Sequence, residues 1–185
     1  MSLDETLFHA INSLVGRSET MDWLMVELAR PGNLYYPGAL LAAFWGWRRW
    51  RECLIGVAAL GGVIGLSDSL GTQIKGFFQR PRPCLRLQDV HQLLGCGSAY
   101  SFPSNHAVNT AAAAAFFQVL YPRSGWVSWP LVAMIGLARV YIGAHYLSDV
   151  VGGWLIGGAV GAGVALLLTR WAWFRPAAED AGRWT

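Results

Sequence analysis

The chain has 185 residues, of which 54% are hydrophobic and only 14% are charged. A soluble domain of this length fills its core with far less apolar surface, so the excess indicates contact with lipid. The net charge of +3 is small and scattered along the chain, which argues against a nucleic-acid-binding protein. Because no change in composition divides the chain, we expect one membrane-embedded domain over residues 1–185, with a motif-bearing core at about 53–170.

The first predicted element is an N-terminal helix that lies on the membrane surface. Four apolar residues share one helical face: Leu3, Leu7, Ile11 and Leu14. Acidic residues stand near the start of the chain, where a secretory signal peptide carries bases. We therefore expect an amphipathic interfacial helix and not a cleaved signal.

Apolar segments follow along the rest of the chain. The break at Pro31 and Gly32 separates the segments 19–30 and 34–47 and leaves open one broken span or two short pieces. The polar turn RRWRE comes next, before a span at 53–74 that is long enough to cross a bilayer. Three more spans and a polar tail complete the chain: 105–121, 126–142, 146–170 and the tail from Arg175. The sequence predicts an all-α integral membrane bundle of about five to six transmembrane helices.

A polar stretch at 79–103 separates two of these spans. It contains Cys84 and Cys96, for which the sequence leaves open a disulfide in an oxidising compartment and two free thiols. Runs of glycine and alanine, including residues 152–163, predict spans that approach one another closely.

Three polar motifs lie at the ends of the spans, at residues 75–83, 103–106 and 139–149. If the span 53–74 rises to Lys75, the next spans alternate in direction and bring the other two motifs to the same face. Arginines outside the motifs gather on the opposite face: Arg48, Arg49, Arg51, Arg123, Arg170 and Arg175. The positive-inside rule then places that opposite face in the cytoplasm and the motifs outside.

The motifs carry more positive charge than nearby acids can neutralise. Lys75, Arg82 and Arg139 therefore predict an anion-binding site, because unpaired charge at a bilayer boundary is costly. The guanidinium fork of arginine matches phosphate oxygens, and a helix that opens near Ser104 adds free backbone N–H groups. A bound phosphate satisfies all of these donors.

Two histidines and an aspartate supply reactive groups. His145 and Asp149 are four residues apart, so on a helix they share a face, and the carboxylate can hold one imidazole nitrogen protonated. The other nitrogen is then free to attack phosphorus, and His106 can protonate the leaving oxygen. Two histidines and one aspartate are a poor zinc set, so we expect no metal and no other cofactor.

Three other charged residues lie near the motifs. Arg80 and Arg86 are expected to be solvated or to contact lipid headgroups. Asp68 lies inside a span, where acids are functional or paired, and we expect it to bind the cationic site or to cap a neighbouring helix.

These residues resemble the type 2 phosphatidic acid phosphatase family, the membrane relatives of vanadium-dependent haloperoxidases. The family's pattern is Lys, six residues, Arg-Pro; then Pro-Ser-Gly-His; then Ser-Arg, five residues, His, three residues, Asp. The chain matches all three elements in order, with Asn105 where glycine is usual and Ala138 where serine is usual.

The resemblance implies a role for each matched residue. His145 is the implied nucleophile that forms a phosphohistidine, Asp149 its orienting partner and His106 the general acid. The implied phosphate clamp consists of Lys75, Arg82, Ser104, Asn105 and Arg139. For Asn105 we expect either a hydrogen bond to phosphate or a helix cap.

The compact architecture and outward site look most like bacterial undecaprenyl pyrophosphate phosphatases of the cytoplasmic membrane. The implied reaction converts undecaprenyl pyrophosphate to undecaprenyl phosphate on the periplasmic or exterior side. A phosphatase for phosphatidylglycerophosphate or phosphatidic acid, and a lipid phosphotransferase, remain alternatives. Haloperoxidases are soluble, unlike this chain, and a non-catalytic lipid-binding protein has no need of the pair His145 and Asp149. The sequence indicates no oligomeric state.

Overall fold

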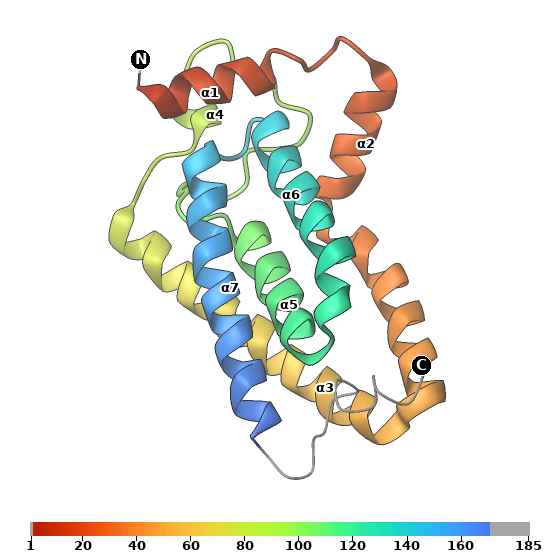
Figure 1. Cartoon of the computed structure of the whole chain (residues 1–185). Coiled ribbons are helices and arrows are strands. Elements are labelled where there is room, and N and C mark those ends of the chain that lie inside the picture. The colour runs from red at the N-terminus through yellow and green to blue at the C-terminus, as the bar shows by residue number, and fades with distance from the viewer. Residues whose placement is uncertain (1, 171–185) are drawn as a thin grey trace.

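The computed structural model describes residues 2–170, and every regular element in this part of the chain is a helix (Figure 1). The all-α prediction is therefore confirmed. The elements follow in this order: α1 (Leu3–Asn12), α2 (Glu19–Ala29), η1 (Pro31–Leu34), α3 (Tyr35–Phe78), α4 (Pro83–Arg86), α5 (Asn105–Leu120), η2 (Pro122–Ser124), α6 (Gly125–Tyr141) and α7 (Leu147–Thr169). In Figure 1, α5, α6 and α7 stand side by side, and α1 lies across one end of this bundle. The predicted polar tail from Arg175 lies outside the described residues.

The N-terminal helix α1 forms where the sequence predicts it. Ser2 and Glu5 build a capping box, with the Glu5 N–H donating to Ser2 Oγ at 3.3 Å and the Ser2 N–H donating to Glu5 Oε2 at 2.9 Å. Phe8 is buried against the bundle, whereas Leu3 is 76% exposed. The helix thus has one face on the protein and an apolar face turned outward, as an interfacial helix requires.

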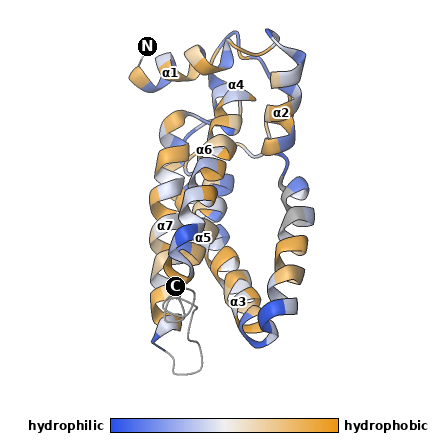
Figure 2. Ribbon diagram, turned by 45° about the vertical axis from the view of Figure 1, so that its right-hand side comes forward, coloured by the Kyte–Doolittle hydropathy of each residue, from blue (hydrophilic) through white to orange (hydrophobic). Residues whose placement is uncertain are grey.

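The long helix α3 is divided by a kink at Arg49, where φ is −149° and ψ is 65°. The kink lies within RRWRE, the segment predicted to be a polar turn, and is visible as the blue corner of α3 in Figure 2. The two predicted segments 34–47 and 53–74 are the arms on either side of it. The turn η1 separates α2 from the first arm, so the chain breaks at Pro31 as predicted, and one broken span and two short pieces both stay open.

Two stretches among the described helices are long and apolar enough to cross a membrane: Gly38–Phe78 of α3 and the whole of α7. Helices α5 and α6 have 16 and 17 residues, fewer than the about 20 that span a hydrocarbon layer. The count of five to six spans therefore stays a prediction.

Glycines of α7 allow its backbone to touch α5. A Cβ atom on Gly157 would overlap the carbonyl oxygen of Val108, and one on Gly161 would overlap that of Ala112. This contact confirms the packing role predicted for residues 152–163. It also aligns the N-termini of the two helices, since the Ser104 N–H donates to the Asp149 carbonyl oxygen at 3.0 Å.

The polar stretch 79–103 folds beneath α1 and carries the short helix α4 (Figure 1). Cys84 and Cys96 are joined by a disulfide, with their Cα atoms 6.1 Å apart, so the first of the two expected alternatives holds. An isolated antiparallel β-bridge between Pro81 and Tyr100 joins the two ends of the loop. The loop is thereby fixed beside the ends of α3, α5 and α7.

Candidate active site

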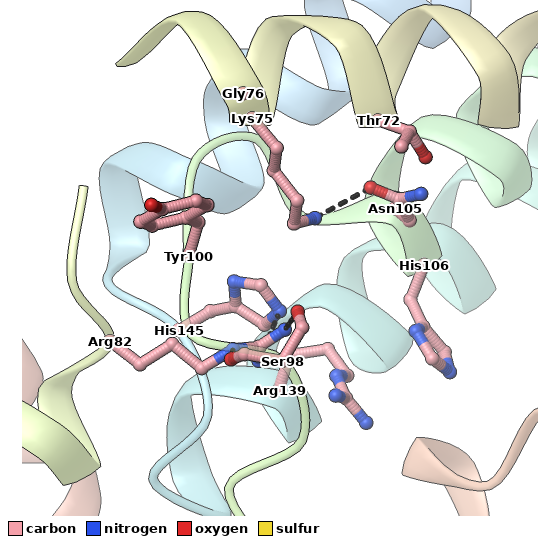
Figure 3. A pocket seen from close by; sticks show the side chains of 10 residues that line it. All are labelled: Thr72, Lys75, Gly76, Arg82, Ser98, Tyr100, Asn105, His106, Arg139 and His145. Carbon is pink, nitrogen blue, oxygen red and sulfur yellow. Dashed lines mark hydrogen bonds between the residues drawn. The ribbon is translucent and has the colours of Figure 1, made fainter. Parts of the chain in front are cut away.

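A cavity of about 540 Å³ lies where α3, α5, α6 and the loop 79–103 meet (Figure 3). Its lining includes residues from all three sequence motifs: Thr72, Lys75, Gly76, Arg82, Ser98, Tyr100, Asn105, His106, Arg139 and His145. In Figure 3, Lys75 reaches the cavity from α3 and Arg139 approaches from the opposite side, with His145 and His106 between them. The fold thus brings together side chains that are 70 residues apart in the chain.

Lys75 is held by the start of α5. Its Nζ donates to the Pro103 carbonyl oxygen and to Asn105 Oδ1, both at 2.6 Å. The amide nitrogen of Asn105 in turn donates to Asp68 Oδ1 at 2.9 Å, and Asn109 donates to the same oxygen at 3.2 Å. Asp68 therefore orients the Asn105 amide so that its oxygen faces the lysine.

This arrangement corrects two expectations. The side chain of Asn105 does not cap α5, whose cap residue is Ser104, and it instead bridges Lys75 and Asp68. Its hydrogen bond to phosphate stays a prediction. Asp68 caps no helix, and within residues 2–170 it reaches the cationic site through Asn105 and not by a direct ion pair.

Arg82 is only 5% exposed and is fixed at three points. Its Nη1 donates to the Ala144 carbonyl oxygen at 3.1 Å and lies 3.0 Å from His145 Nε2. Its Nε and Nη2 donate to the carbonyl oxygen of Ser98 at 2.5 Å and to Ser98 Oγ at 3.0 Å. Gly97 adopts φ of +78°, a conformation that glycine tolerates, and the turn places Ser98 under the guanidinium. Sequence reasoning missed Ser98, because no motif or spacing marks this residue.

Arg139 is anchored by an element outside the three motifs. Its Nη1 donates to the carbonyl oxygen of Ala29, at the C-terminal end of α2, at 3.0 Å. The last carbonyls of a helix lack partners within the helix and are the negative end of its dipole, so they hold a guanidinium well. The contribution of α2 to the site was not foreseen.

His145 and Asp149 lie close together, although not on one helical face as predicted. The helix α7 begins at Leu147 with Tyr146 as its cap, so His145 precedes the helix. Asp149 Oδ2 accepts from the Tyr146 N–H at 2.9 Å and lies 3.5 Å from His145 Nδ1. The carboxylate therefore caps α7 and faces the imidazole at the same time.

Burial of His145, reinforced by the positive charge of Arg82, lowers the pKa of its imidazole well below the usual value. The side chain is 1% exposed and lies in the loop before α7. A neutral imidazole at physiological pH keeps a lone pair available for attack.

Several site residues carry a buried polar atom that has no hydrogen-bond partner within residues 2–170: Ser104 Oγ, His106 Nε2, Arg139 Nε and His145 Nδ1. Buried polar atoms are nearly always paired in folded proteins. Three of these atoms belong to residues that line the cavity, His106, Arg139 and His145, where a polar ligand would supply the missing partners. Ser104 and Asp149 do not line the cavity themselves, and both are fully buried behind it.

The position of Arg80 corrects the expectation that it is solvated. Its Nη1 donates to Asp149 Oδ1 at 2.7 Å and its Nη2 to Asp4 Oδ2 at 2.5 Å. Sequence reasoning had no route to this arrangement, because Asp4 is 76 residues away. Arg86 is closer to the expectation, since it is half exposed and lies 3.6 Å from Glu5.

Comparison with known proteins identifies a family, a relative and two solved structures that this chain resembles. The family model described as "PAP2 superfamily" matches residues 56–175. The chain is 30% identical to the undecaprenyl-diphosphatase BcrC of Bacillus subtilis over 159 residues, which cover 84% of this chain and 79% of that protein. Among solved structures, Aquifex aeolicus LpxE superposes with a TM-score of 0.70 and 27% identity, covering 90% of this chain and 96% of that one.

A transmembrane PAP2-type phosphatidylglycerolphosphate phosphatase from Bacillus subtilis also superposes with a TM-score of 0.70. The match covers 95% of this chain and 90% of that one, at 22% identity, and shows that the two share a fold.

Proposed function

Because the chain belongs to the PAP2 superfamily, whose members include lipid phosphatases, we propose that it hydrolyses a lipid phosphate or pyrophosphate through a phosphohistidine on His145. The observation that carries the proposal is the meeting of His145 and His106 with Lys75, Arg82 and Arg139 around one cavity. Three cations and two imidazoles suit the binding of a phosphoryl group and its transfer.

In the first step the Nε2 lone pair of His145 attacks phosphorus while the bond from phosphorus to the leaving oxygen breaks. The imidazole proton then lies on Nδ1, facing Asp149 Oδ2 at 3.5 Å, where the carboxylate stabilises the developing positive charge. His106 gives its proton to the leaving oxygen. In the second step water attacks phosphorus, and His106 takes the water's proton. The bond from phosphorus to His145 Nε2 breaks, so the imidazole is restored and phosphate leaves.

The three cations stabilise the charge that builds on the equatorial oxygens of the transferring phosphoryl group. Arg82 is held by Ser98 and Ala144, and Arg139 by Ala29, so both guanidinium groups are in place before substrate binds. Only the contact between Arg82 Nη1 and His145 Nε2 has to give way to the phosphoryl group. Preorganised donors of this kind supply most of the catalytic power of phosphoryl transfer. We therefore propose that turnover needs no metal ion.

The proposed substrate is undecaprenyl pyrophosphate, which would be converted to undecaprenyl phosphate. The similarity to an undecaprenyl-diphosphatase over 84% of the chain supports this choice. We place the chain in a bacterial cytoplasmic membrane with the site outside. The kink of α3 and the connection between α5 and α6, which carry Arg48, Arg51 and Arg123, lie at the end of the bundle opposite α1 (Figure 1), and the positive-inside rule assigns that end to the cytoplasm.

The proposal is tested by phosphate release from purified protein in detergent with EDTA. Undecaprenyl pyrophosphate, phosphatidylglycerophosphate and phosphatidic acid are compared for the wild type and His145→Ala. We expect metal-free turnover, fastest with undecaprenyl pyrophosphate, that is lost in His145→Ala and retained in His91→Ala, a control in which the replaced side chain is exposed. Full activity of His145→Ala would exclude the phosphohistidine, and a faster rate on another lipid would reassign the substrate.

A further inference from the structure

Arg80 bonds to two carboxylates that are far apart in the sequence, Asp4 and Asp149. Its Nη1 donates to Asp149 Oδ1 at 2.7 Å, and its Nη2 donates to Asp4 Oδ2 at 2.5 Å. The guanidinium also stacks on the ring of Tyr146, 4.0 Å from the centroid, and its Nη1 donates to Ser148 Oγ at 2.6 Å. Arg80 does not line the cavity, so these contacts give it a place behind the site and not in it.

The two oxygens of Asp149 have different partners. Oδ1 is occupied by Arg80, whereas Oδ2 accepts from the Tyr146 N–H and faces His145 Nδ1 at 3.5 Å. Asp149 is fully buried, and a buried carboxylate is costly unless a cation and hydrogen bonds satisfy it. Arg80 therefore does two things: it compensates the charge of Asp149, and it fixes the carboxylate plane so that Oδ2 points at the imidazole.

Asp4 holds the other side of the guanidinium. Its Oδ1 accepts from the Ser148 N–H at 3.1 Å, and its Oδ2 accepts from both Ser148 Oγ and Arg80 at 2.5 Å. Burial alone raises the pKa of Asp4, but the hydrogen bonds from Ser148 and Arg80 outweigh it and lower the pKa below the usual value. Asp4 is therefore ionised at physiological pH.

The helix that carries Asp4 is itself fixed to the bundle. Asn12, at the other end of α1, is 1% exposed and donates through Nδ2 to the carbonyl oxygens of His91 at 2.8 Å and Tyr141 at 2.7 Å. Phe8 packs on Tyr146 with the ring centroids 5.8 Å apart. The position of Asp4 is thus set by buried contacts and does not depend on one exposed ion pair.

We propose that Arg80 is a positioning residue for the pair His145 and Asp149, and that α1 supports it through Asp4. The surface helix then belongs to the catalytic support of the enzyme, in addition to any contact with lipid. This inference rests on the proposed role of His145 as the nucleophile. It assigns to Arg80 no contact with substrate, which distinguishes it from Lys75, Arg82 and Arg139.

The inference predicts a defect in turnover and not in substrate binding. Arg80→Gln is expected to lower kcat about 10- to 100-fold, the range typical of residues that orient a reacting group through a second side chain, with KM changed less than about threefold. The charged and titratable groups that interact with Asp149 are Arg80, Asp4, His145 and Tyr146, together with Lys75 and Arg82 from the cavity. With its cation removed, Asp149 is protonated more easily, so the acidic limb of the kcat profile should move to higher pH.

The experiment measures kcat, KM and the kcat profile in detergent with EDTA for Arg80→Gln, Asp4→Asn and the double variant. Asp4→Asn should lower kcat less than Arg80→Gln does, and the double variant should be no worse than Arg80→Gln, because both act on the same group. Arg86→Gln is the matched control, since this neighbouring arginine pairs with α1 through Glu5 but does not reach Asp149. It should keep the wild-type kcat and profile.

A rise in KM at unchanged kcat would show that Arg80 binds substrate and would overturn the inference. Wild-type kcat and profile in Arg80→Gln would overturn it as well. If Arg80→Gln does not fold, Arg80→Lys carries the test, because an ammonium keeps the charge but cannot hold both carboxylates with a planar fork. Its kcat should fall at constant KM, and a wild-type kcat would count against the proposal. Activity in His145→Ala would instead refute the phosphohistidine mechanism, a separate outcome.

Discussion

The Nε2 atom of His145 lies 3.0 Å from Nη1 of Arg82, and both side chains are almost completely buried. A guanidinium at this distance disfavours a second positive charge on the imidazole and adds to the effect of burial. The same arginine is placed to hold a phosphoryl oxygen. The proposed nucleophile and one proposed phosphate ligand are therefore in direct contact in the site.

The lowered pKa of His145 predicts a pH dependence of stability. Below about pH 6.5 the unfolded imidazole binds a proton that the folded one does not, so stability falls as the pH falls. For one proton the slope reaches about 1.4 kcal/mol per pH unit. Thermal unfolding between pH 7.5 and 5.5 should show a steeper loss for the wild type than for His145→Gln, whose side chain does not titrate. Parallel slopes would contradict the prediction.

His106→Ala should lower kcat by about 10²- to 10⁴-fold, the usual contribution of a general acid. The loss should shrink with p-nitrophenyl phosphate, because its leaving group departs without being protonated. Rates on the lipid substrate and on this ester, for the variant and the wild type, provide the measurement. An equal loss on both substrates would assign His106 to binding and not to proton transfer.

Asn105→Gly removes the amide that connects Lys75 to Asp68. We expect KM to rise about fivefold, because one hydrogen bond that positions the ammonium is worth about 1 kcal/mol. Asn109→Ala is the matched control, since Asn109 also donates to Asp68 but is not bonded to the lysine. A KM that rises equally in both variants, or in neither, would argue against a positioning role for Asn105.

Loss of the disulfide between Cys84 and Cys96 should destabilise the protein by about 3 kcal/mol, the typical value for a loop of this length. Arg82 and Ser98 flank the two cysteines, and the disulfide holds their chain segments together. Its loss should therefore raise KM as well. Tm and KM are measured for Cys84→Ser/Cys96→Ser with and without dithiothreitol. The reductant should affect the wild type and leave the double variant unchanged; an equal response of both would place the effect elsewhere.

Gly157→Ala should destabilise the bundle by about 1–3 kcal/mol, because the added methyl group overlaps the carbonyl oxygen of Val108. Gly163→Ala, on the same helix, is the control: a Cβ there meets nothing within 4 Å. It should leave Tm unchanged or raise it slightly, since alanine favours helix more than glycine does. Equal Tm values for the two variants would contradict the packing described for α5 and α7.

Hydropathy predicted the helices well, because an apolar run long enough to cross a bilayer has few alternatives to helix. The alternation of helix direction also predicts Lys75, His106 and His145 on one side, and in the structure all three line the same cavity. Residue spacing alone did not predict where a helix begins. His145 lies outside α7 because Asp149 caps that helix through the Tyr146 N–H, and the spacing of four residues does not reveal which residue begins the helix.

The residues that support the site could not be predicted from the sequence for a different reason. Arg80 meets Asp4, and Arg139 meets Ala29, across separations of 76 and 110 residues. No periodicity or spacing encodes such contacts, because they depend on how the N-terminal helices fold back over the bundle. Asn105 illustrates the same point: its partner Asp68 is recognisable as unusual in a span, but the amide between Asp68 and Lys75 is visible only in three dimensions.

The contact between Arg139 and Ala29 matters for the design of chimeras between this protein and its relatives. The family match begins at residue 56, whereas Asp4 and Ala29 lie well before it. A chimera that joins residues 56–170 to the N-terminal helices of a relative keeps every motif residue. It keeps the two supports only where those helices place a carboxylate beside Arg80 and a free carbonyl oxygen beside Arg139. The module that can be exchanged between relatives is therefore larger than the region defined by its motifs.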